Sequence, residues 1–122
     1  LRARLGLLRD EAQDRADRAR DRGLLWAAFR ESGAARDEAP AANEGHHAAG
    51  SAVVHVGKTA CALALIPLED VLALRDQPNL PGTTTEYPNW RRRLPGPAEE
   101  ILGEPAAAAR LTALAEARTE TP

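Results

Sequence analysis

The chain has 122 residues, the size of one ordinary domain. Its formal net charge of −2 supplies no basic surface for nucleic acid or an anionic membrane, so neither is expected as a partner. No apolar run approaches the roughly 20 residues that a membrane span requires. Aromatic residues make up 3% of the chain, so a core must consist mainly of leucine, alanine and valine. Cys61 is the only cysteine, which excludes an internal disulfide and favours a reducing cytoplasm.

The absence of methionine indicates that the chain is part of a longer protein. No methionine occurs at any position, and the sequence opens with Leu1. We therefore expect a fragment, whose first partner is the remainder of its parent chain.

Two helices are predicted at the start of the chain. In residues 1–22, apolar side chains recur at steps of three and four, which places them on one helical face. Gly23 is the expected break between the two helices. Residues 24–32 then form a short amphipathic helix that ends before Gly33. The same pattern also fits one kinked helix.

The middle of the chain combines a loop, an ambiguous segment and a predicted strand. Residues 34–50 lack periodicity and are expected to form a loop insert. Residues 51–59 fit a helix, although their valines also permit a strand. Residues 60–66 (ACALALI) form a continuous apolar run, which is typical of a strand buried on both faces in a parallel sheet. Pro67 then suits the first turn of a short helix.

A proline-rich segment over residues 76–97, which we call the strap, follows this helix. Its prolines exclude a helix and disfavour a central strand, which leaves an ordered strap or a disordered linker. Tyr87 and Trp90 are potential anchors and favour order. Residues 105–118 are predicted to form an alanine-rich helix.

The strap also carries the most specific pattern in the chain. Residues 77–94, QPNLPGTTTEYPNWRRRL, combine an Asn-x-Pro-Gly turn with a Pro-Asn-Trp-Arg element. This combination resembles the C-terminal signature of the amylomaltases, bacterial 4-α-glucanotransferases that are also called disproportionating enzymes. Residues 62–74 (ALALIPLEDVLAL) resemble the last barrel strand of that family and the helix after it. The opening residues LRARLGLLRDEA are similar to a stretch downstream of the family's His-Asp motif.

The resemblance implies an α/β fold class, in which the chain forms the C-terminal portion of a (β/α)8 TIM-type barrel. A complete barrel takes about 250 residues, so this chain can supply only the closing part. We expect residues 1–97 to be mostly helical, with one or two short parallel strands and the strap. Residues 98–122 are expected to add a C-terminal alanine-rich helix and tail.

The reaction of that family depends on three carboxylates, which the resemblance places before Leu1. They are an aspartate nucleophile, a glutamate acid/base and a second aspartate that stabilises the transition state. None of the three histidines of the chain is followed by aspartate, so the His-Asp motif is absent. We therefore assign no catalytic residue within this sequence, and we expect no cofactor.

Two strap residues are candidate substrate-binding residues by the same resemblance. The Asn79 amide both donates to and accepts from hydroxyl groups, but asparagine before Leu-Pro-Gly also makes turns, and both interpretations stay open. The Trp90 indole offers a flat apolar face of the kind on which sugar rings stack. Packing of Trp90 as an anchor of the strap is the favoured interpretation, and sugar stacking is the alternative.

Two other patterns do not define a site. The three arginines at 91–93 follow a tryptophan in a net acidic chain, which is typical of a solvated face with local carboxylate partners. The spacing of the possible metal ligands fits no zinc pattern, so no metal site is expected. These possible ligands are Glu44, His46, His47, His55 and Cys61.

The chain is thus predicted to be a fragment of a 4-α-glucanotransferase, an enzyme that transfers α-1,4-glucan segments between maltooligosaccharides. The expected partners are maltooligosaccharides or other α-1,4-glucans, and the fragment alone is expected to be inactive. A small non-catalytic helical interaction module is the alternative.

Overall fold

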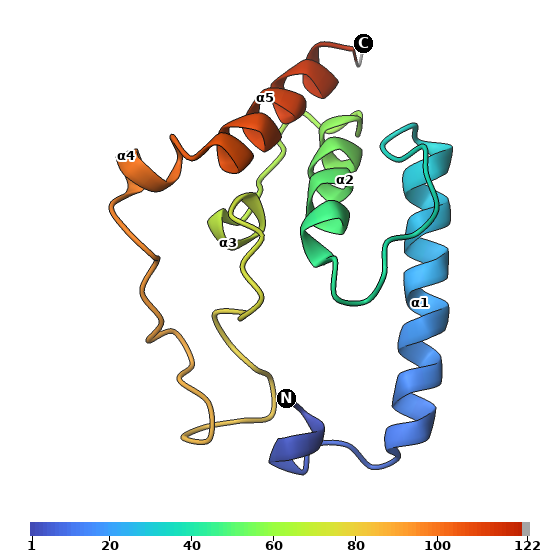
Figure 1. The fold of residues 1–122 in the computed structure, drawn as a ribbon, viewed down its shortest axis with the longest axis vertical. Coiled ribbons are helices and arrows are strands. Elements are labelled where there is room, and N and C mark those ends of the chain that lie inside the picture. The colour runs from blue at the N-terminus through green and yellow to red at the C-terminus, as the bar shows by residue number, and fades with distance from the viewer. Residues whose placement is uncertain (121–122) are drawn as a thin grey trace.

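Helices joined by irregular segments make up the structure, a computed structural model that describes residues 1–120. In chain order they are η1 (Ala3–Leu5, a 3-10 turn), α1 (Glu11–Glu31), α2 (Gly45–Gly57), α3 (Leu68–Val71), α4 (Ala98–Ile101) and α5 (Pro105–Thr119). Helix α2 stands at the centre, with α1 alongside it and α5 across its C-terminal end (Figure 1). No helix within residues 1–120 combines the length and the apolar character needed to cross a membrane.

One helix, α1, replaces the two predicted over residues 1–22 and 24–32, and it runs through Gly23 without interruption. The break predicted at Gly23 is therefore wrong. The helical start predicted at residue 1 is also wrong, because α1 begins at Glu11. The helix begins where the Asp10 carboxylate accepts the Gln13 backbone N–H at 3.0 Å. Gly23 has open space around it, so a glycine there costs only the roughly 1 kcal/mol of its intrinsic helix propensity. The continuous ladder of backbone hydrogen bonds outweighs this cost.

The C-terminal end of α1 confirms the prediction made at Gly33. This glycine has a φ of +70°, the left-handed conformation that ends many helices. The Ala34 N–H then donates back to the Phe29 carbonyl at 2.7 Å. The Trp26 indole N–H donates to the Asp37 carbonyl at 2.9 Å and ties the following loop to the helix.

Helix α2 begins earlier than the sequence pattern predicts. It includes residues 45–50, so the loop expected over 34–50 ends at Glu44. The helical interpretation of residues 51–59 is confirmed as far as Gly57, and the strand interpretation is wrong. Valine lowers helix propensity only slightly, so the burial of one face of α2 can outweigh the preference of these valines for a strand.

The strand predicted over residues 60–66 is absent, and this overturns the α/β fold class. No strand or sheet occurs within residues 1–120, so the part that the structure describes is helical and shows no piece of a barrel. Residues 60–66 follow an irregular path, with Leu63 71% and Leu65 78% exposed. An extended segment becomes a strand only when a neighbouring strand pairs with its N–H and C=O groups. The apolar run led us to expect a buried strand, but within residues 1–120 no neighbouring strand pairs with it.

The core of the structure depends on the close packing of α2 against α5. A Cβ atom added at Gly57 would lie 2.8 Å from the Ala117 Cβ and 3.3 Å from the Leu114 carbonyl oxygen. Ala117 at this contact and Val53, one turn before Gly57 in α2, are both buried. The two backbones therefore approach each other because the residues between them are small.

Substitution of Gly57 by alanine is expected to destabilise the chain by about 1–3 kcal/mol, because the new methyl group overlaps the Ala117 side chain and the backbone of α5. The control is Gly50→Ala in the same helix, where the added Cβ meets nothing within 4 Å. That change is expected to stabilise by about 0.5–1 kcal/mol through helix propensity. Urea unfolding measures both values, and the same sign for the two variants would contradict the packing described.

Candidate functional site

The strap (residues 76–97) is ordered through contacts of its own side chains. It leaves α3, bends back and ends at α4, without regular secondary structure (Figure 1). Tyr87 is only 3% exposed, and its hydroxyl donates to the Gln77 carbonyl at 2.6 Å. The Arg92 guanidinium lies 5.0 Å from the centre of the Tyr87 ring and also contacts Asp76 at 2.9 Å. Tyr87 is therefore the buried anchor of the strap.

The Asn89 side chain clasps the two arms of the strap together. Its Oδ1 accepts the Leu80 backbone N–H at 2.8 Å. Its Nδ2 donates to the Thr83 carbonyl at 3.2 Å and to the Thr83 hydroxyl at 3.0 Å. The sequence pattern contains Asn89 within the Pro-Asn-Trp-Arg element but predicts no role for it. An asparagine can make these three bonds at once because its amide both donates and accepts.

Trp90 follows this clasp in a backbone conformation that bulky residues rarely adopt. Its φ is +58°, and its backbone N–H donates to the Pro78 carbonyl at 2.8 Å. The side chain is 74% exposed. The favoured interpretation of Trp90 as a packing anchor is therefore wrong, and its indole is presented to solvent.

A groove of about 420 Å³ lies beside the exposed indole, between the strap and α3. Its polar lining includes the carboxylates of Glu69 and Asp76 and the guanidinium groups of Arg75, Arg92 and Arg93. Charged groups of both signs around an aromatic face can donate to and accept from a polyhydroxylated ligand. The groove is thus suited to a ligand with an apolar face and a hydroxylated rim.

Asn79, the other predicted contact, is not among the residues that line this groove. It is half-buried next to Leu80, and its side chain forms no hydrogen bond within residues 1–120. The structure therefore does not bring Asn79 and Trp90 into one pocket. Both residues nevertheless belong to the same strap, on either side of the Asn89 clasp.

Glu86 stabilises the tip of the strap as a carboxylate. Its Oε2 accepts the backbone N–H of Thr84 at 2.8 Å and that of Thr85 at 3.0 Å. These hydrogen bonds, foremost that from Thr84, lower the pKa of Glu86 below its ordinary value. The charged form is thus the one that the folded strap prefers.

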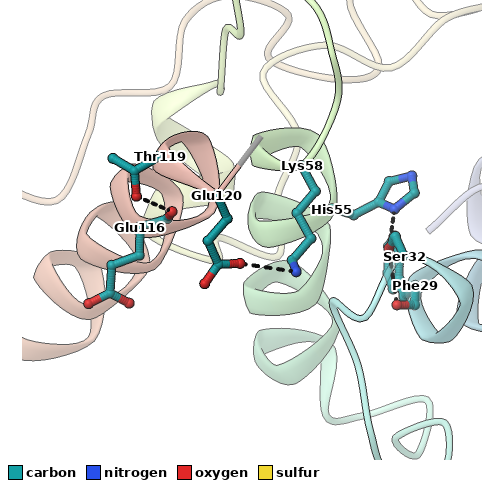
Figure 2. Close-up of polar contacts among 7 residues, drawn as sticks. All are labelled: Phe29, Ser32, His55, Lys58, Glu116, Thr119 and Glu120. Atoms are coloured by element: carbon teal, nitrogen blue, oxygen red, sulfur yellow. Dashed lines mark hydrogen bonds and ion pairs between the residues drawn. The ribbon is translucent and has the colours of Figure 1, made fainter. Parts of the chain in front are cut away.

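The histidines lie outside the strap, in α2. Figure 2 shows the Ser32 hydroxyl 2.8 Å from the Nδ1 atom of His55, a contact between the end of α1 and α2. The rings of His46 and His47 lie 4.1 Å apart at the start of α2. Within residues 1–120, no three side chains of the types that bind metals gather into one site.

The described residues therefore form a set of helices that presents an ordered strap with an exposed tryptophan beside a polar groove. The sequence model of the 4-alpha-glucanotransferase family matches residues 10–99, which include the strap. Because this match covers most of the chain, the chain belongs to the 4-alpha-glucanotransferase family.

Individual relatives agree with the family match. The chain is similar to the 4-alpha-glucanotransferases of Mycobacterium bovis and of two strains of Mycobacterium tuberculosis. Each is 38% identical to it over 98 residues, which cover 80% of this chain and 13% of the relative. The chain thus spans only a small part of the length of these relatives. No solved structure matches the chain.

Replacement of Asn89 by aspartate is expected to destabilise the chain by roughly 1–3 kcal/mol. Aspartate keeps the acceptor for Leu80 but removes both donors to Thr83 and places a charge beside its carbonyl. Asn79→Asp is the matched control, because the Asn79 side chain forms no hydrogen bond within residues 1–120. We expect the free energy of unfolding of that control, measured by thermal unfolding, to stay within about 0.5 kcal/mol of that of the unsubstituted 122-residue chain. Equal losses in the two variants would argue against the clasp.

The strap tip is expected to loosen in acid through Glu86. A pKa lowered by folding gives a stabilisation that is present above the pKa of the unfolded chain, and it is lost as the pH falls through the folded pKa. The amide NMR signals of Thr84 and Thr85 should therefore move together with the protonation of Glu86. In Glu86→Gln this titration should disappear, and its persistence would assign the transition to another group.

Proposed function

We propose that this chain is the glucan-contacting part of an enzyme that transfers α-1,4-glucan segments from donor to acceptor maltooligosaccharides. Family membership supports this proposal, because the match includes the strap. The observation that carries it is the exposed indole of Trp90, which a left-handed backbone conformation holds beside a polar groove.

In this proposal Trp90 stacks on a sugar ring while the charged groups around it bind hydroxyls. The Glu69 and Asp76 carboxylates accept hydrogen bonds, and the Arg93 guanidinium donates them. Asn79 contacts a second sugar residue through its amide, which has no partner within residues 1–120. The substrates are maltooligosaccharides or other α-1,4-glucans.

The catalytic carboxylates come from the remainder of the parent chain in this proposal. Residues 1–97 belong with the body of the enzyme in this proposal, and residues 98–122 add the C-terminal alanine-rich helix and tail. A reducing cytoplasm is the proposed compartment, in keeping with the single exposed Cys61. The chain alone then binds glucan but does not transform it.

Maltotriose titrated into the Trp26→Phe variant is expected to shift the tryptophan emission to shorter wavelength. Trp90 is then the only tryptophan, because the chain has two. Trp90→Ala in the otherwise unsubstituted 122-residue chain should weaken maltotriose binding about tenfold, because the indole face that the sugar would cover is lost. Calorimetry measures this affinity. Leu63→Ala, which truncates an exposed apolar side chain outside the groove, is the control and should not weaken it.

The same mixtures, assayed for glucose, are expected to show no release from maltotriose. An unchanged Trp90 emission at saturating sugar would overturn the proposed contact. Glucose release by the purified chain would overturn the assignment of the catalytic residues to the remainder of the parent chain.

A further inference from the structure

A second groove, of about 550 Å³, lies between the N-terminal segment, α1 and the start of the strap. Its charged lining consists of Arg2, Arg15, Arg18, Arg22, Glu11 and Asp14. Four guanidinium groups against two carboxylates leave a net side-chain charge of +2 in this groove. The chain as a whole carries −2, so the positive charge is a local feature.

Arg2 is the residue that sets this groove apart. It is half-buried, and its Nε atom is enclosed without a hydrogen-bond partner within residues 1–120. Its other side-chain atoms form no ion pair or hydrogen bond in that part of the chain either. A buried N–H donor without an acceptor is unfavourable, so the Nε–H group of Arg2 points to a ligand that accepts hydrogen bonds. The excess of positive side chains in the groove favours an anionic one.

The other arginines differ in how far they are already engaged. Arg15 contacts the Glu11 carboxylate through Nε at 3.0 Å and through Nη2 at 2.6 Å, so these two charges largely satisfy each other. Arg22 donates to the Pro40 carbonyl at 3.0 Å, a contact that leaves its charge uncompensated. Arg18, like Arg2, has no partner within residues 1–120. The groove thus keeps donors for a ligand on both its N-terminal wall and its α1 wall.

We propose that this groove binds a phosphate group, with Arg2 and Arg18 as its principal donors. A phosphate monoester carries a charge of about −1.5 to −2 near neutral pH, which matches the net charge of the lining. Its oxygens accept the forked N–H pairs that guanidinium groups present. The proposal does not depend on glucan binding by the strap, which involves a different groove.

Calorimetric titration of the 122-residue chain with inorganic phosphate, at constant ionic strength, tests the site. Arg2→Gln and Arg18→Gln should each weaken binding about tenfold, the usual effect of losing a charged hydrogen bond. Arg20→Gln is the matched control, because Arg20 is exposed on the same helix and does not line the groove. It should bind phosphate within about twofold of the parent chain.

A parallel titration with glucose 6-phosphate distinguishes the two sources of the phosphate group. Tighter binding than that of inorganic phosphate would assign the groove to a phosphate ester. Equal affinity would assign it to the free anion.

Thermal unfolding separates a ligand-binding arginine from a structural one. Without phosphate, Arg2→Gln should melt at the same temperature as the unsubstituted 122-residue chain or higher, because it removes an unpaired half-buried charge. The same variant should lose the rise in melting temperature that phosphate gives the parent chain. The proposal fails if millimolar phosphate neither binds nor stabilises, if Arg20→Gln loses as much affinity, or if Arg2→Gln melts lower without phosphate.

Discussion

The contact between α2 and α5 at Gly57 is the constraint on which the rest of the structure depends. With so few aromatic side chains, the chain gains burial by bringing two backbones together over glycine and alanine. Helix α5 also holds other elements in place, because Arg110 donates to the Val71 carbonyl at 2.9 Å and Arg118 to the Thr59 carbonyl at 3.1 Å. The strap starts after α3 and returns before α5, so both of its ends are fixed by this packing.

Within that frame, the strap shows how a segment without helix or sheet acquires a defined shape. Leu80 and Tyr87 bury their side chains, and the Asn89 amide replaces the backbone pairing that a sheet would supply. The positive φ of Trp90 is locally unfavourable, and the surrounding hydrogen bonds hold the backbone in this conformation. The Trp90 side chain, which is mostly exposed, is thereby held in a defined place at the surface.

Local signals in the sequence predicted some helix ends, but not the starts of α1 and α2. Gly33, Pro67 and Pro105 lie at helix boundaries as their backbone preferences require, because such preferences act within a few residues. The prediction of a strand over residues 60–66 was wrong because strand pairing depends on residues far away in the sequence, which the local hydrophobic pattern does not reveal. In the strap, the two potential anchors correctly predicted order, whereas sugar contact by Trp90 stays a prediction. The Asn89 clasp was not predicted, because it joins residues six to nine positions apart through side-chain geometry.

Lys58 is the only lysine of the chain, and its position gives that fact a physical meaning. Its amine lies 3.4 Å from the Glu120 carboxylate, so it joins the last turn of α2 to the far end of α5. Acylation of this amine would remove one charge from the whole molecule, and it would do so at the junction of the two central helices. Among the side chains of this sequence, amine-directed chemistry therefore labels a single, structurally defined position.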